Sequence, residues 1–417
     1  MSEIINTPEA DSSAVEDPNA AAVESPSYIQ RRSFGQLLRG DLGFVPVLIT
    51  LIIIIIFFQI ITNGLFFNTG NLTNLFLQTA QIGLCGLGVI LVLLLGEIDL
   101  SVAAVSTLCG VVMGVLSERV GLPPWLSIPG GLLAGALAGF INGYFIAVLR
   151  IPSFIVTLAS SISYSGLLIT LLNNQATLLI QNSFISSIAG SPKSYFPDSL
   201  GIGLPTAAVL LYVLYRIINY RRRASMGLRN PSLPQFLAYL IITVVLVEGA
   251  VILFESNHGV PYSTGILFGA IVLFWILLTK TSWGRHVYAV GGNKEAARRA
   301  GISIVTIQLT VFTLCSALAA VGGIIEASLT FSASTQVSPF LLLNAIAAAV
   351  IGGVSLFGGK GSVWAIVLGM LIIGSLSNGL ALKNLGTDAL EIIEGLVLLA
   401  AVTADALIRR LQMRTGR

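Results

Sequence analysis

Long runs of apolar residues constrain the fold of this 417-residue chain more than any other feature of its sequence. A helix needs about 20 apolar residues to cross the hydrocarbon core of a bilayer. Candidate runs lie at residues 44–62, 77–95, 101–117, 126–149, 154–172, 200–218, 235–254, 263–279, 305–325, 340–357, 363–382 and 392–408. The chain is 55% hydrophobic and only 10% charged, which leaves too much apolar surface for one water-soluble core. We therefore predict an all-α fold, a polytopic membrane helix bundle of about 12 transmembrane helices, within a range of about 10 to 12.

The region before the first run has a different composition. Residues 1–40 are rich in Ala, Ser, Pro and acidic residues and carry few large apolar side chains. Such a segment cannot bury enough surface to fold, so we expect a disordered cytoplasmic tail. The run at 44–62 has no small-residue cleavage site behind it and is expected to stay as an anchor instead of being removed as a signal peptide. The predicted transmembrane domain is 41–410.

The positions of lysine and arginine predict the orientation. Cytoplasmic loops of membrane proteins collect positive charge. If the N-terminus is inside, twelve crossings place all but three of the 22 lysines and arginines on the cytoplasmic side, the exceptions being Arg119, Lys193 and Lys383. Both termini are therefore expected to be cytoplasmic. The net charge of +3 reflects this topology, so no nucleic-acid partner is expected.

Four acidic residues lie inside or at the ends of apolar runs: Glu97, Asp99, Glu248 and Glu394. An acidic side chain at the centre of a membrane helix costs about 2.5 to 3.5 kcal/mol on insertion scales. Glu97 and Asp99 belong to the stretch GEIDLS between the second and third runs. There, Asp99 or Ser101 either caps the third helix or takes part in gating or the translocation path.

Glycines recur every fourth residue in the fourth run, at Gly131, Gly135, Gly139 and Gly143. This spacing places them along one helix stripe, where another backbone can approach closely. The stripe indicates either helix packing alone or a face beside the pathway. Hydroxyl groups follow in the next run, at Ser160, Ser161, Ser163 and Tyr164. They either bond other helices or bond their own backbone.

The loop WGRHVYAVGGNKEAARRAGISI, residues 283–304, is far more polar than a connector requires. Asn293 suits a helix N-cap, Glu295 suits the first turn, Arg298 and Arg299 suit the last turn, and Gly301 suits the stop. We expect a short charged helix at the membrane face. It is either a solvated connector or a coupling helix that docks on a cytoplasmic partner.

No chemistry-bearing motif of an enzyme is found in the sequence. GGVSLFGGKGS, residues 352–362, resembles a P-loop, but Gly361 follows Lys360 and Val354 stands where the first glycine is required. A tight glycine turn between two helices is expected instead. The cysteines at 85, 109 and 315 lie inside apolar runs, and the histidines at 258 and 286 are isolated, so neither a metal nor a cofactor is expected.

Three stretches in this order, GEIDLS, AVGGNKEAARRAGI and GGVSLFGGKGSVW, resemble the sugar-type permease subunits of bacterial ABC importers, over residues 70 to 405. Several members of that family have a second glycine where Glu97 stands. The segment 200–260, a helix pair around the basic loop YRRRASMGLRNPSL, resembles the longer xylose-type members.

The resemblance implies a multi-pass subunit of the bacterial inner membrane that transports a monosaccharide, with xylose or a related sugar favoured. It implies as partners a cytoplasmic ATP-binding subunit, an extracytoplasmic sugar-binding protein, a second copy of the chain and the lipid bilayer. The coupling loop, 284–303, would contact the ATPase through Gly292, Asn293, Lys294, Glu295, Ala297, Arg298, Arg299 and Gly301. The expected path or gating residues are Glu97, Asp99, Ser101, Asn142 and Asn378. Asn142–Gly143 and Asn378–Gly379 lie on runs of opposite direction, as in inverted repeats.

Two other functions fit twelve helices. A proton-coupled secondary sugar transporter would carry its proton on the intramembrane acids. The other alternative is a passive channel or a structural membrane protein. Both leave the polar loop at 283–304 without a role.

Overall fold

The computed structural model describes residues 45–228 and 230–384, together with residue 386 and six isolated positions between 392 and 403. The chain divides into two compact units, 1–42 and 43–417, and every described residue belongs to the second unit. The predicted tail at 1–40, Arg229 and Glu394 lie outside the described residues, as does most of the last apolar run.

Each of the first eleven apolar runs contains a helix. The helices are α2 (Val45–Ile61), α3 (Thr69–Leu94), α4 (Val102–Glu118), α5 (Pro124–Ala147), α6 (Ser153–Leu171), α8 (Asp198–Ser225), α9 (Leu233–Glu255), α10 (Tyr262–Lys280), α13 (Ile304–Leu329), α14 (Pro339–Ile351) and α15 (Ala365–Leu382). Within the described part, eight of them are long and apolar enough to cross a membrane, and three further apolar helices are shorter. The predicted all-α polytopic class is confirmed at this level.

Some predicted bounds were wrong. α3 begins eight residues before the predicted start at 77, because its polar first turns carry a good N-cap: the Asn68 side chain accepts a hydrogen bond from the Gly70 amide. α14 ends at Ile351, not at 357, because the backbone of Gly353 takes a left-handed conformation with φ of +102°. Hydropathy counts the apolar residues of such a loop as if they were helical.

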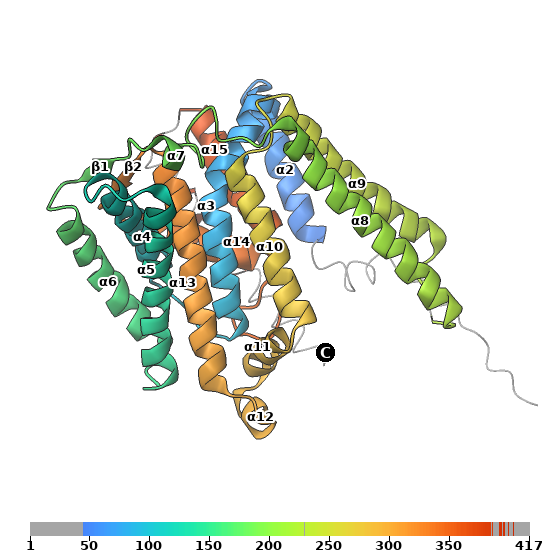
Figure 1. The fold of residues 1–417 in the computed structure, drawn as a ribbon. Coiled ribbons are helices and arrows are strands. Elements are labelled where there is room, and N and C mark those ends of the chain that lie inside the picture. Colours follow the sequence, from blue (N-terminus) through green and yellow to red (C-terminus); the bar gives the residue numbers. More distant parts are fainter. Residues whose placement is uncertain are drawn as a thin grey trace, which may run out of the picture. The chain divides into compact units, whose positions relative to one another are not determined.

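α3 is the most buried of the candidate spanning helices, with 83% of its apolar window inside the protein. It packs against α13, α14, α15 and α10 (Figure 1). By contrast, α8 and α9 pack on each other, and α9 also contacts α3. Most of their apolar surface is exposed, as expected for helices that face lipid.

The glycine stripe of α5 packs on α13. A Cβ atom at Gly139 would lie 2.4 Å from the carbonyl oxygen of Phe312, and one at Gly135 would lie 2.6 Å from the Cβ of Ala320. Larger residues would hold the two helices apart, so the packing interpretation of this stripe is confirmed.

A short β-ribbon, absent from the predicted all-α fold, joins two loops. β1 (Thr177–Leu179) pairs antiparallel with β2 (Ser332–Ser334), with Leu178 opposite Ala333. α4 begins near α12 (Lys294–Arg299) and ends against β1 and β2. The helix α12 and the β1–β2 ribbon therefore lie at opposite ends of the bundle, which we call the α12 end and the ribbon end (Figure 1).

Candidate functional site

The polar loop at 283–304 folds into two helices, α11 (Ser282–Gly292) and α12 (Lys294–Arg299). The prediction for α12 is confirmed: the Asn293 side chain accepts a hydrogen bond from the Ala296 amide at 2.9 Å, and Gly301 follows with φ of +81°. α11 was not predicted. Its cap is Thr281, whose hydroxyl accepts a hydrogen bond from the Gly284 amide at 3.2 Å.

α11 is held firmly against the bundle. Val287 and Val290 are fully buried, and the Trp283 indole donates a hydrogen bond to the Thr310 hydroxyl of α13 at 3.0 Å. The Tyr288 hydroxyl donates to the carbonyl of Gly361 at 2.9 Å. Burial raises the pKa of Tyr288, so its hydroxyl stays protonated as a donor.

Four glycines, Gly96, Gly291, Gly358 and Gly359, bring three backbones into contact at the α12 end; we call this the glycine junction. The Gly359 amide donates to the Leu94 carbonyl at 2.9 Å. A Cβ at Gly358 would lie 2.7 Å from the Gly291 carbonyl oxygen. Gly96, Gly358 and Gly359 also take left-handed φ values. The glycine-rich loop is therefore a tight turn whose glycines pack against other backbone segments, and the predicted glycine turn is confirmed.

Glu97 lies where three other elements meet. Its carboxylate accepts hydrogen bonds from Lys294 at the start of α12 at 2.5 Å, from Ser153 at the start of α6 at 2.6 Å, and from Gln308 in α13 at 3.1 Å. The side chain of Glu97 is only 14% exposed, whereas that of Lys294 is 45% exposed. Sequence reasoning assigned Glu97 and Lys294 to different groups, and the structure joins them.

A buried chain of polar side chains begins two residues after Glu97. Asp99 accepts hydrogen bonds from the Ser101 amide at 2.9 Å and the Ser101 hydroxyl at 2.6 Å. Asn142 donates to Ser101 at 2.9 Å, and Ser160 donates to Asn142 at 2.6 Å. The chain therefore links the α3–α4 loop to α5 and α6. Ser101 is the N-cap residue of α4, but its side chain makes no capping hydrogen bond, so the expected cap is wrong at that residue.

A small cavity of about 50 Å³ adjoins Glu97 and Asp99. Its remaining lining is apolar: Val89, Val92, Leu93, Ile98, Ile346 and Leu356. The second carboxylate oxygen of Asp99 is buried and has no hydrogen-bond partner. The α3–α4 loop therefore has space beside it that no side chain fills.

Asn378 belongs to a different cluster. It accepts a hydrogen bond from Asn71 at 2.9 Å and donates to Gln78 at 3.5 Å, both on α3. Asn378 lies four residues before the end of α15, near the ribbon end, whereas Asn142 lies near the α12 end. The expected path residues are therefore split between the two ends of the bundle.

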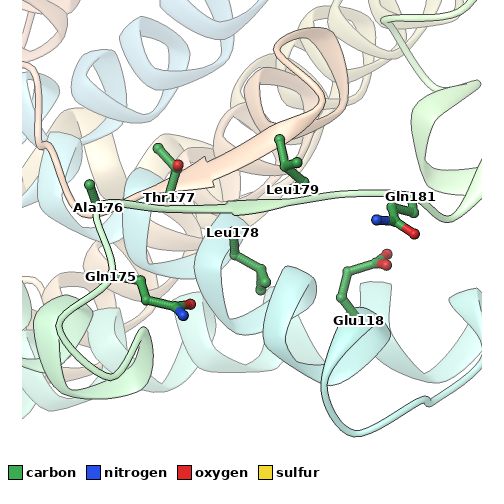
Figure 2. Close-up of a pocket in the computed structure, with 7 residues that line it drawn as sticks. All are labelled: Glu118, Gln175, Ala176, Thr177, Leu178, Leu179 and Gln181. Carbon is green, nitrogen blue, oxygen red and sulfur yellow. The ribbon is translucent and has the colours of Figure 1, made fainter.

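The ribbon end carries a further feature that sequence reasoning missed. An open hollow of about 610 Å³ is lined by Glu118, Gln175, Ala176, Thr177, Leu178, Leu179 and Gln181 (Figure 2). The Arg119 guanidinium donates to the side-chain oxygen of Gln175 at 2.7 Å and to the Leu171 carbonyl at 2.8 Å. Arginine thus fixes the ends of α4 and α6 beside this hollow.

Glu248 is separate from the contacts of Glu97 and Asp99. Glu248 accepts a hydrogen bond from Thr206 at 3.1 Å, within the α8–α9 hairpin. Among residues 45–228 and 230–384, no group of three or more His, Cys, Asp or Glu side chains could hold a metal ion. Cys85, Cys109 and Cys315 are free and buried.

A bundle of apolar helices long enough to span a bilayer, with an anchored polar helix pair at one end, defines a polytopic membrane protein. The sequence profile described as "Branched-chain amino acid transport system / permease component" matches residues 71–402. The chain therefore belongs to this family of permease components.

Individual relatives are similar along most of their length. The xylose transport system permease protein XylH of Escherichia coli (strain K12) is 34% identical over 377 residues, which are 90% of this chain and 95% of the relative. The fructose import permease protein FrcC of Rhizobium meliloti is 31% identical, covering 89% of this chain and 88% of the relative. The ribose import permease protein RbsC of Haemophilus influenzae is 31% identical, covering 86% and 91%. No solved structure matches the chain. The resemblance to sugar-type permease subunits is confirmed.

Proposed function

We propose that this chain is the membrane-spanning subunit of an ATP-binding-cassette importer that carries a monosaccharide, xylose or a related sugar, across the bacterial inner membrane. The relatives named for xylose, fructose and ribose support the substrate class. A separate cytoplasmic subunit hydrolyses the ATP. The glycine-rich loop that resembles a P-loop supports this division of labour, because its glycines pack against Leu94 and Gly291.

One observation carries the proposal: the structure anchors a polar helix pair to the bundle and leaves the far side of its second helix exposed. Glu295, Arg298 and Arg299 have side chains between 59% and 81% exposed. Ala297 is buried and faces the bundle. We assign contact with the ATP-binding subunit to Gly292, Asn293, Lys294, Glu295, Arg298, Arg299 and Gly301, with Ala297 as the internal support.

The gating residues of the proposal lie at both ends of the bundle. Asp99, Ser101 and Asn142 form a connected chain of hydrogen bonds at the α12 end, and Glu97, two residues before Asp99, accepts a hydrogen bond from Ser153. Asn378 would act at the ribbon end, with Asn71 as its partner. Polar side chains in membrane proteins concentrate where a substrate passes or a gate moves.

The topology of the proposal has twelve transmembrane helices and both termini in the cytoplasm. The α12 end is then cytoplasmic and the ribbon end faces outward. This orientation brings the three basic residues expected outside, Arg119, Lys193 and Lys383, to the same end, because they follow α4, α7 (Ser183–Ser186) and α15, each of which ends at the ribbon end. The sugar-binding protein would dock at the ribbon end, and a second copy of the chain would complete the translocation unit.

Reconstitution in vesicles tests the function. The chain alone, and the chain together with its ATP-binding subunit and sugar-binding protein, are compared for uptake of radiolabelled xylose. We expect concentrative uptake only when both partners are present and ATP is supplied in the compartment that contains the ATP-binding subunit. Uptake by the chain alone, driven by a pH gradient, would overturn the proposal in favour of proton coupling.

A further inference from the structure

The position of Lys294 in α12 is not explained by the stability of that helix. Lys294 is the first residue of α12, where the positive end of the helix dipole disfavours a cation. The helix has its own internal ion pairs, because Glu295 lies 3.4 Å from Arg298 and 3.7 Å from Arg299. The contact that accounts for Lys294 is the one outside its helix, with Glu97, 197 residues away in sequence.

Glu97 depends on that contact more than a surface acid would. A carboxylate that is only 14% exposed loses much of its hydration and must be compensated by donors. Of its three donors, Gln308 and Ser153 are neutral, and Lys294 alone carries a positive charge. If α12 moves away with Lys294, the Glu97 carboxylate is left underpaired, so the α3–α4 loop must rearrange with it.

The same loop is tied to the interior of the bundle. The amide of Ile98 donates to the Ser153 hydroxyl at 3.5 Å, and the amide of Leu100 donates to the Thr157 hydroxyl at 3.1 Å. Asp99 and Ser101 then continue into the chain that reaches Asn142. The neighbouring cavity of about 50 Å³ gives this loop room to shift without displacing a packed side chain.

The helices α11 and α12 are attached to the bundle in different ways. α11 is fixed by backbone contacts at the glycine junction and by the Tyr288 and Trp283 hydrogen bonds. α12 contacts α11 and the start of α13, and its charged link to the bundle is the Lys294–Glu97 pair. The geometry therefore gives α12 more freedom to move than α11.

We propose that the Glu97–Lys294 ion pair is a latch that passes movement of α12 to the polar chain of Asp99, Ser101 and Asn142 at the α12 end. It is closed in the state that the structure shows and opens when the ATP-binding subunit moves α12. Glu97 is thereby a positioning residue for transport, acting through the α3–α4 loop on Asp99, Ser101 and Asn142. This inference rests on the proposed function.

Charge exchange tests the pair. In the complete importer, Glu97→Lys and Lys294→Glu are each expected to lower ATP-driven sugar uptake about tenfold, because each leaves two like charges facing one another. The double variant should return uptake to within about twofold of wild type, since Gln308 can turn its amide oxygen toward a cation. Arg222→Glu, an exposed charge reversal at the end of α8, serves as the matched control and should keep wild-type uptake. No recovery in a double variant that inserts and co-purifies with the ATP-binding subunit would overturn the latch.

Cross-linking separates a moving latch from a static ion pair. A Glu97→Cys/Lys294→Cys variant of the complete importer is treated with a short, cleavable bifunctional thiol reagent in the resting state and after trapping with ATP and vanadate. The latch predicts a cross-link yield several-fold lower in the trapped state, and an arrest of uptake that cleavage of the reagent reverses. Equal yields in the two states would show a static pair and overturn the inference. The native cysteines are buried and give little background.

The two failures are distinguishable. If the wild-type importer shows no ATP-dependent uptake, the proposed function fails and the latch fails with it. The latch alone fails in two cases in which wild-type uptake is ATP-driven. In the first, the double charge exchange does not restore uptake; in the second, the cross-link yield is the same in the resting and trapped states.

Discussion

The backbone of Gly291 passes so close to the carbonyl of Leu94 that a Cβ atom at Gly291 would lie 1.7 Å from that oxygen. The same atom would lie 2.8 Å from the amide nitrogen of Gly359. α11 can reach the end of α3 only because residue 291 has no side chain. This contact seats α11 on the most buried of the eight candidate spanning helices.

Gly291→Ala should therefore force the glycine junction apart. An added methyl group in a packed site costs about 1 to 3 kcal/mol, and here the opposing atoms are backbone, which yields less than a side chain. We expect a lower melting temperature in detergent and loss of ATP-driven transport. Gly269→Ala on α10 is the matched control, because a Cβ there meets no atom within 4 Å. Equal melting temperatures for the Gly291→Ala and Gly269→Ala variants would contradict the claim that the glycine junction requires a residue without a side chain at position 291.

The buried polar chain gives a second prediction. Ser160→Ala removes the donor that lies 2.6 Å from Asn142. Interhelical hydrogen bonds in membrane proteins contribute about 0.6 kcal/mol on average, so a small loss of stability is expected, with a larger loss of transport if the chain belongs to the gate. Ser163→Ala is a control on the same helix, because Ser163 bonds the carbonyl of Ala159 in its own helix. The readouts are thermal unfolding and uptake rate. If the Ser160→Ala and Ser163→Ala variants are indistinguishable in both, the hydrogen-bonded side chains from Asp99 to Ser160 have no role in the gate.

Thiol labelling tests the proposed topology. Arg222→Cys and Arg298→Cys should face the cytoplasm, and Lys193→Cys should face outward, as the distribution of basic residues requires. An impermeant reagent applied to intact cells should modify only Lys193→Cys, while permeabilised cells expose all three. Modification of position 222 from outside would refute the helix count that precedes it.

The local features of the fold could be predicted from the sequence, and the long-range contacts could not. Each of the first eleven apolar runs contains a helix, and the cap at Asn293 and the stop at Gly301 lie where their residue types favour them. These signals act over a few residues. The pairing of Glu97 with Lys294 spans 197 residues and leaves no periodic trace in the sequence.

Other omissions have equally specific causes. Gln308 lies in the first turns of an apolar run, where hydropathy treats it as a tolerated exception, although it donates to Glu97. Tyr288 and Trp283 gave no sign that α11 packs on the bundle, because aromatic residues are frequent at membrane surfaces in any case. The ribbon of β1 and β2 is three residues long on each side, too short for an alternating pattern.

The central claim is that α12 couples this subunit to an ATPase, and Glu295→Lys and Gly301→Leu test it most directly. The first change places a cation at the start of α12, at a cost of about 0.3 to 1 kcal/mol, and removes the partner of Arg298 and Arg299. In the second, a Cβ at Gly301 meets no atom within 4 Å, so leucine acts through the backbone: at φ of +81° it costs about 1 to 2 kcal/mol and re-aims the helix end.

The decisive measurement is sugar-stimulated ATP hydrolysis by the purified complex, recorded together with co-purification of the ATP-binding subunit. Both substitutions lie outside the apolar spans, so membrane insertion should match that of wild type. The account predicts that each variant inserts normally but loses stimulation, co-purification or both. Full stimulation and full co-purification in both variants would contradict it and reduce α12 to a connector.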